Sequence, residues 1–321
     1  MKIKQKLVLI LKIIIVVISY AYVIYTLIKA PDLSKLPQLF TGFSFYQISI
    51  FVLVCLLMIV NWTIEAFKWQ LLLKDIEPKS YVNAIKAVFA GVSVGLATPN
   101  RAGEFGGRIL FLKHENRSIG GFLALAGSFS QLAVTLIIGL IGFTVLLMIS
   151  PQSRDLFAVS DILITAIGFL FAGFILLLYL KIDYFSGKIA KIPLINKLKN
   201  LSSYPELWNI TKKLKVFALS IIRYVIFIHQ FYLLVYILDI NIDYTDAMLV
   251  ISVIYLLMAV VPIISIGEPG LRVSFSLILF SIFTNQAVAV FSASILLWII
   301  NVAVPAVLGS LFIFNVKKSK I

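Results

Sequence analysis

The chain has 321 residues, of which 61% are hydrophobic and only 13% are charged, and its mean hydropathy is +1.05. A soluble domain of this length needs far more polar surface, so the composition excludes an ordinary soluble enzyme. The formal charge of +14 does not indicate nucleic acid, because the lysines stand in short segments beside apolar runs. In those places lysines set membrane topology and contact anionic headgroups.

Six apolar runs predict membrane-spanning helices, because about 20 apolar residues cross a ~30 Å hydrocarbon core. In chain order they are residues 8–28, 47–72, 119–149, 160–181, 215–238 and 287–315. Lysines cluster at both termini and in a loop of residues 182–214. Cytoplasmic loops carry an excess of Lys and Arg, so we expect both termini and this loop on the cytoplasmic side of the plasma membrane.

With the basic segments on the cytoplasmic side, two further apolar segments must each begin and end on the same side of the membrane. Residues 81–117 have to begin and end inside, and residues 247–284 have to begin and end outside. We therefore predict an all-α integral membrane protein with about six full transmembrane helices and two re-entrant helical hairpins. Eight full transmembrane helices are the alternative.

Both predicted hairpins carry the pattern G-E-x-G-x-R, at residues 103–108 and 267–272. Because the hairpins enter from opposite sides, we predict an inverted repeat within one transmembrane domain, residues 1–321. Its halves span about 45–150 and about 215–316. Interrupted helices in inverted repeats are typical of secondary transporters, whose sites lie near the midplane. The expected helix breakers are Pro99, Gly103, Gly106, Gly107, Pro262, Gly267, Pro269 and Gly270.

Five charged residues lie at these patterns in apolar surroundings: Arg101, Glu104, Arg108, Glu268 and Arg272. A charge at membrane depth costs about 2.5 kcal/mol or more, so it pairs with a partner or faces water. One interpretation is ion pairing at i, i+4, Glu104 with Arg108 and Glu268 with Arg272, which leaves Arg101 without a partner. The other is a polar cavity in which the arginines bind a phosphate or carboxylate.

Four further polar residues inside spans are possible supporting residues: Asn61, Glu65, His229 and Asn301. Asn61, Glu65 and the nearby Lys68 share one helix face, and we interpret them first as markers of the cytoplasmic end of their span. Glu65 reaching the cavity is the second interpretation. His229 is expected to be a packing residue or, less simply, a proton relay. Asn301 stands on a packing face near Pro305, where it could cap broken backbone.

No enzyme signature stands out, since the chain lacks H-E-x-x-H, P-loop, G-x-S-x-G and dinucleotide patterns. Two histidines and a single cysteine argue against a conventional zinc site. We expect neither a metal nor a cofactor.

At the first pattern and its surroundings the chain resembles the transmembrane region of lysylphosphatidylglycerol synthases, a flippase-like family also called UPF0104. The resemblance is carried by Asn61-Trp62, Lys68-Trp69, Thr98-Pro99-Asn100-Arg101-Ala102-Gly103-Glu104, Arg108, Glu268-Pro269-Gly270-Leu271-Arg272, Trp298, Asn301, Pro305 and Gly309. The chain departs from the family at Ser130-Gln131, where family members often have an acidic–basic pair. It also departs in the second G-E-x-G-x-R pattern, which is richer in glycine in many members.

The resemblance implies movement of lipid between leaflets, without the aminoacyl-transferase domain that follows this region in the synthases. The leading hypothesis is a flippase or transporter for a phosphate-bearing lipid, either a phospholipid or a polyprenyl phosphate. Its partners would be anionic or phosphate-bearing membrane lipids, and we expect no nucleic acid. One alternative is a polyprenyl-phosphate glycosyltransferase or its membrane accessory subunit. Another is a membrane scaffold without a substrate.

Overall fold

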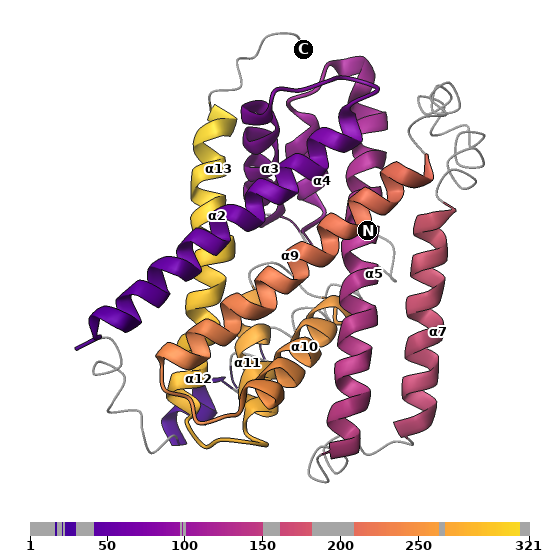
Figure 1. Ribbon diagram of the computed structural model, residues 1–321. Coiled ribbons are helices and arrows are strands. Elements are labelled where there is room, and N and C mark those ends of the chain that lie inside the picture. Colours follow the sequence, from indigo (N-terminus) through magenta and orange to yellow (C-terminus); the bar gives the residue numbers. More distant parts are fainter. Residues whose placement is uncertain are drawn as a thin grey trace. The chain divides into compact units, whose positions relative to one another are not determined.

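The computed structural model describes residues 17, 21, 23–29, 42–96, 98, 101–149, 161–181, 209–262 and 267–314. Within these residues the chain is all-α and forms no strand (Figure 1). The elements are α2 (Phe45–Leu73), α3 (Tyr81–Leu96), α4 (Gly103–Ile109), a 3₁₀ turn η4 (His114–Asn116), α5 (Arg117–Ile149), α7 (Asp161–Leu180), α9 (Ile210–Ile237), α10 (Tyr244–Val260), α11 (Glu268–Phe280), α12 (Ala287–Trp298), a π-helical segment η8 (Ile299–Ala303) and α13 (Val304–Phe314).

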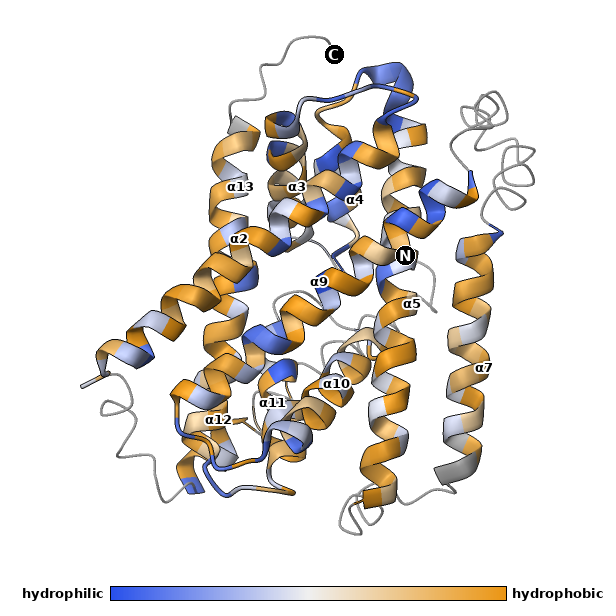
Figure 2. Ribbon diagram, viewed as in Figure 1, coloured by the Kyte–Doolittle hydropathy of each residue, from blue (hydrophilic) through white to orange (hydrophobic). Residues whose placement is uncertain are grey.

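Among the described residues, four helical stretches are long and apolar enough to cross a membrane. They are Phe45–Leu73, His114–Ile149, Ile210–Ile237 and Ala287–Ile313, and Figure 2 shows apolar residues along most of their length. These stretches match four of the six predicted spans. Most of the first predicted span and of the basic loop at 182–214 lies outside the described residues. An all-α membrane fold is confirmed, and the number of full spans stays a prediction.

The chain forms two compact units, and long helices contribute to both. Unit 1 comprises residues 1–58, 135–167 and 226–303, and unit 2 comprises residues 59–134, 168–225 and 304–321. The first G-E-x-G-x-R pattern therefore lies in unit 2 and the second in unit 1. In each unit the pattern begins a short helix, α4 or α11, shortly after an apolar helix of 16 or 17 residues, α3 or α10.

Close approach of glycines brings α3 and α4 together in unit 2. A Cβ atom on Gly107 would lie 2.5 Å from the carbonyl oxygen of Ala90 and 2.6 Å from Cα of Gly91. A Cβ atom on Gly95 would lie 2.5 Å from Cγ of Glu104. Small residues four apart on both helices let their backbones meet, which is a common packing mode inside membranes. This contact fixes α4, and hence Arg108, against α3.

In unit 1, α10, α11 and α12 follow one another along the chain, and α10 also packs against the second part of α5. A Cβ atom on Gly139 would lie 2.7 Å from Cβ of Leu256, and a Cβ atom on Gly142 would be crowded still more closely by the hydroxyl of Ser252. Ser276 on α11 and Ser294 on α12 join the two helices through a 3.1 Å hydroxyl–hydroxyl hydrogen bond. The short polar side chains satisfy each other where the helices approach closely.

The last predicted span is interrupted by the π-helical segment Ile299–Ala303. Pro305 follows this segment, and a proline cannot donate a hydrogen bond to the carbonyl of residue i−4, here Asn301. Widening of the helix to a π-bulge accommodates such a position, and π-bulges are frequent at functional sites. The sequence predicted a kink at Pro305, and the structure shows an altered helical winding just before it.

Candidate functional site

A buried carboxylate in unit 2, that of Glu65 on α2, holds three cations from three helices. Its Oε1 accepts a hydrogen bond from Nη1 of Arg108 on α4, at 2.7 Å. Its Oε2 lies 2.9 Å from Nζ of Lys68, one turn along α2, and also pairs with Nη1 of Arg223 on α9. All four side chains are less than a tenth exposed. We call this set, together with Arg101 and Glu104, the unit 2 cluster.

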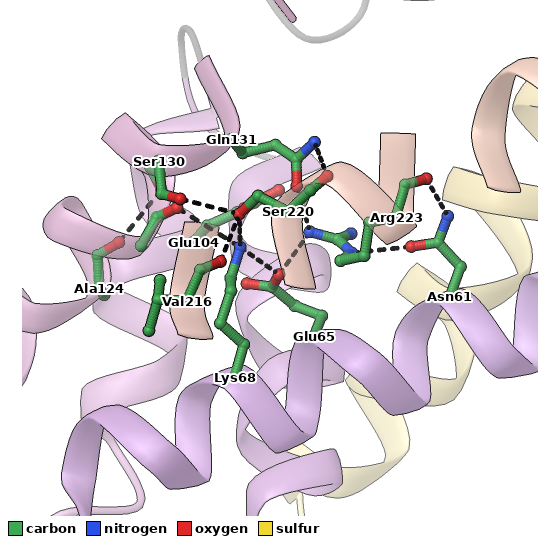
Figure 3. Close-up of polar contacts among 12 residues, drawn as sticks. Asn61, Glu65, Lys68, Glu104, Ala124, Ser130, Gln131, Val216, Ser220 and Arg223 are labelled. Carbon is green, nitrogen blue, oxygen red and sulfur yellow. Dashed lines mark hydrogen bonds and ion pairs between the residues drawn. The ribbon is translucent and has the colours of Figure 1, made fainter. Parts of the chain in front are cut away.

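The position of Arg223 is fixed by two further side chains. Its Nε donates to Oδ1 of Asn61 at 2.7 Å, and its Nη1 lies 3.3 Å from Oε1 of Gln131 on α5. Figure 3 shows Asn61, Glu65 and Lys68 projecting from one face of α2 towards the side chains of α5 and α9. The spacing of Asn61, Glu65 and Lys68, i, i+4 and i+7, places them on one helix face.

Three oxygen atoms from three side-chain or backbone groups hold the ammonium group of Lys68. Besides Glu65, its Nζ donates to Oγ of Ser220 at 3.3 Å and to the carbonyl oxygen of Gly127 at 3.4 Å. Oγ of Ser220 in turn lies 3.0 Å from Oγ of Ser130 (Figure 3). These contacts satisfy a buried ammonium group, which would otherwise be costly.

The arginine at the helix break, Arg101, pairs with Glu104, whereas the ion-pairing interpretation of the sequence gave Arg101 no partner. Nη2 of Arg101 lies 2.7 Å from Oε1 of Glu104, whereas Arg108 lies 3.8 Å from the other oxygen of Glu104. The predicted i, i+4 pair is therefore present, but Glu65, 43 residues away, holds Arg108 more closely, at 2.7 Å. Arg101 and Glu104 are partly exposed and form the accessible edge of the unit 2 cluster.

Two tryptophans of α2 lie under the guanidinium groups of the cluster. The Arg108 guanidinium lies 5.9 Å from the ring of Trp69, and that of Arg223 lies 5.6 Å from the ring of Trp62. Both distances allow cation–π attraction. The buried indole nitrogens of Trp62 and Trp69 and the buried Nε of Arg108 have no hydrogen-bond partner among the described residues. The cluster therefore contains buried donors beyond those that its carboxylates use.

The second pattern, in unit 1, forms the pair predicted from sequence. Nη2 of Arg272 lies 3.2 Å from Oε1 of Glu268, and both side chains are largely buried. The ring of Tyr255 on α10 lies 5.7 Å from the Arg272 guanidinium. Within the described residues, the ion pair recorded here joins one cation to one carboxylate. Gly267 stands at the N-cap of α11, with Pro269 in its first turn, where proline is well tolerated.

The remaining predicted residues have various surroundings. His229 lies 3.1 Å by its Nε2 from the hydroxyl of Tyr244, a hydrogen bond that suits the packing interpretation. Asn301 is buried in the π-helical segment, and its Nδ2 donates to the carbonyl oxygen of Leu297 at 3.2 Å. A Cβ atom built on Gly106 would meet no other atom within 4 Å among the described residues. Pro262 is exposed just after α10, and Pro99 lies outside the described residues.

Sequence reasoning placed Asn61, Glu65 and Lys68 chiefly at the end of a span, and the structure instead buries them in the cluster. It missed Arg223, Ser220 and Gln131 as site residues. A usable signal was present, because Asn61, Glu65 and Lys68 share one face of an otherwise apolar helix. An arginine inside the later span 215–238 was the natural candidate for their partner.

A separate polar pocket of about 700 Å³ lies in unit 2 where α2 ends and α5 begins. Glu77 lines this pocket and accepts hydrogen bonds from Lys79 (2.5 Å), the Asn116 side-chain amide (2.9 Å) and the backbone N–H of Lys113 (3.1 Å). Burial alone would raise the pKa of Glu77, but these hydrogen bonds outweigh burial and lower the pKa below its ordinary value of 4.5. Glu77 therefore ties the loop after α2 to the start of α5.

Within the described residues, no group of three or more His, Cys, Asp or Glu side chains could hold a metal ion. No curated protein matches the chain. The model of one protein family, the lysylphosphatidylglycerol synthase TM region, matches residues 9–309. This match spans nearly the whole chain and both G-E-x-G-x-R patterns, in agreement with the helices long and apolar enough to cross a membrane. The chain is a multi-pass membrane protein that belongs to the lysylphosphatidylglycerol synthase transmembrane-region family, a family related to lipid modification and flipping.

Proposed function

We propose that this protein is a flippase or transporter that moves a phosphate-bearing lipid between the leaflets of the plasma membrane. The observation that carries the proposal is the charge of the unit 2 cluster. Its cations are Lys68, Arg101, Arg108 and Arg223, and its carboxylates are Glu65 and Glu104. Among the residues that the structure describes, these four cations face two carboxylates, an excess of two positive charges within the cluster.

Buried charges are normally paired, because removing them from water costs several kcal/mol per ion. An unbalanced buried cluster is therefore best matched by an anionic ligand. Arginine suits phosphate, since its planar fork of donors matches phosphate oxygens, and a guanidinium is weakly hydrated. The unused donors of Arg108, Trp62 and Trp69 add hydrogen bonds that a phosphate or its ester oxygens could accept.

The exposed edge of the cluster supports a lipid as the source of the phosphate. Arg101 stands at the break between α3 and α4 with a φ of 54°, a conformation uncommon for residues other than glycine. Strained backbone of this kind persists mainly where function requires it. Arg101 would contact the phosphate first, and the acyl or prenyl tails would stay in the hydrocarbon.

We further propose that the two G-E-x-G-x-R patterns belong to an inverted repeat with two re-entrant hairpins. α3 and α10 have 16 and 17 residues, at or below the length that crosses a bilayer. Each is followed by a break and a short helix that begins with the shared pattern. In unit 1 the Nε of Arg272 is buried without a hydrogen-bond partner among the described residues, and we propose Arg272 as a second phosphate ligand.

Reconstitution into liposomes tests the proposal. The probe is fluorescently labelled phosphatidic acid, and the measurement is the rate at which inner-leaflet label becomes accessible to a membrane-impermeant quencher. We expect wild-type protein to accelerate this movement, and we expect Arg101→Ala, Arg108→Ala and Arg272→Ala to slow it at least about tenfold, which corresponds to about 1.4 kcal/mol in the barrier to transport. Lys74→Ala, which removes an exposed cation outside the cluster, is the control. Equal rates in all five proteins would disprove a phosphate site.

A further inference from the structure

The carboxylate of Glu65 occupies the position in the unit 2 cluster where cations converge most closely. Arg108 approaches one of its oxygens, and Lys68 and Arg223 approach the other (Figure 3 labels Glu65, Lys68 and Arg223). Three cations from three helices around two oxygens are the arrangement that also suits a phosphate. Glu65 and a phosphate would therefore seek the same donors.

We propose that Glu65 is an internal counterion that competes with the lipid phosphate for Lys68, Arg108 and Arg223, and thereby sets how readily the lipid is released. This inference rests on the function proposed above. In the absence of lipid, Glu65 prevents mutual repulsion of the three cations. When the phosphate binds, Glu65 gives up part of its contacts, and it regains them when the phosphate leaves.

The need for such a residue follows from the task of a transporter. A site must bind its cargo well enough to load and weakly enough to unload. In a medium of low dielectric constant, three buried cations without a carboxylate would hold a phosphate very tightly. Glu65 makes release an exchange of one anion for another, so the cations never lack a partner.

The other carboxylate of the cluster is placed differently. Glu104 pairs with Arg101 at the exposed edge, is about a fifth exposed, and lies 3.8 Å from Arg108. Solvent screens it more than it screens Glu65. The competing role therefore falls to Glu65, which has close contacts with all three buried cations.

The test measures binding by the full chain in detergent, with dioctanoyl phosphatidic acid as one probe and inorganic phosphate as the other. We expect Glu65→Gln to bind phosphatidic acid at least about tenfold more tightly than wild type and to move labelled lipid more slowly in liposomes. A purely structural role of Glu65 would weaken binding. Glu77→Gln, the same charge change in the same unit but outside the cluster, should bind like wild type.

Glu65→Asp serves if Glu65→Gln does not fold. It keeps the charge but draws the carboxylate back by one methylene, so we expect affinity above that of wild type. Unchanged or weaker binding by whichever variant folds overturns the inference. If the affinity for inorganic phosphate rises as much as the affinity for phosphatidic acid, the phosphate alone is the ligand group. If only the affinity for phosphatidic acid rises, the lipid tails are recognised as well. Binding of neither probe by wild type overturns the proposed function and this inference together.

Discussion

Nη1 of Arg108 lies 2.7 Å from Oε1 of Glu65, although 43 residues separate the two along the chain. This contact joins the G-E-x-G-x-R pattern to the C-terminal half of α2. It also explains why a conspicuous local pair, Glu104 with Arg108, is not the closest pair in the structure. The side chains of Arg108 and Glu65 are both buried, so solvent screens their attraction less than that between Arg108 and the partly exposed Glu104.

Removing Glu65 should destabilise the protein more than removing any one of its cations. In Glu65→Leu three buried cations lose their shared carboxylate, and breaking a buried ion pair in this way costs about 3–5 kcal/mol. In Arg108→Met the carboxylate keeps Lys68 and Arg223, so we expect a smaller loss. The midpoints of thermal unfolding in detergent provide the comparison. A larger loss for Arg108→Met would contradict the central role of Glu65.

Adjacent glycines of α4 should respond oppositely to alanine. In Gly107→Ala the new Cβ atom meets the backbone of α3, and overpacking of this kind costs about 1–3 kcal/mol. In Gly106→Ala the Cβ atom enters open space, and the gain in helix propensity is worth about 0.5–1 kcal/mol. Thermal unfolding of both variants checks the prediction, and equal shifts of the two midpoints would refute the α3–α4 contact.

Glycine at position 101 should separate backbone strain from anion binding. Both Arg101→Gly and Arg101→Ala lose the guanidinium and should bind phosphatidic acid equally poorly. In the folded state, a φ of 54° costs alanine about 1–2 kcal/mol more than it costs glycine. The unfolded chain of the glycine variant has more conformational freedom, which offsets only part of this difference. We expect the glycine variant to be more stable by about 1 kcal/mol. Equal unfolding midpoints would show that the break between α3 and α4 is unstrained.

Stability should fall in acid partly because of Glu77. The folded state lowers the pKa of Glu77, so its hydrogen bonds stabilise the fold fully above the ordinary pKa of 4.5. That stabilisation fades as the pH falls below 4.5 and is lost once the pH is below the lowered pKa. Unfolding midpoints measured from pH 7 to pH 3 should therefore decline less steeply for Glu77→Gln than for wild type. If the unfolding midpoints of the two proteins decline in parallel, Glu77 does not contribute to the loss of stability in acid.

Composition and order along the chain were enough to predict a helical membrane protein with broken helices at both G-E-x-G-x-R patterns. Apolar runs of 20 or more residues have few alternatives to a spanning helix, because the bilayer offers no other partner for backbone groups. Glu268 and Arg272 were likewise correctly paired, since both stand on one helix and their spacing alone brings them together.

The sequence by itself therefore determined the membrane class, the positions of the breaks and the pairs formed within one helix. Only the tertiary structure decided that Glu65 collects Lys68, Arg108 and Arg223, and that the resulting cluster has more cations than carboxylates. Helical periodicity states which residues share a face of one helix, but it carries no information about which other helix that face meets. The partner of a buried charge is chosen by packing, and here close contact between glycines of α3 and α4 brings Arg108 within reach of α2.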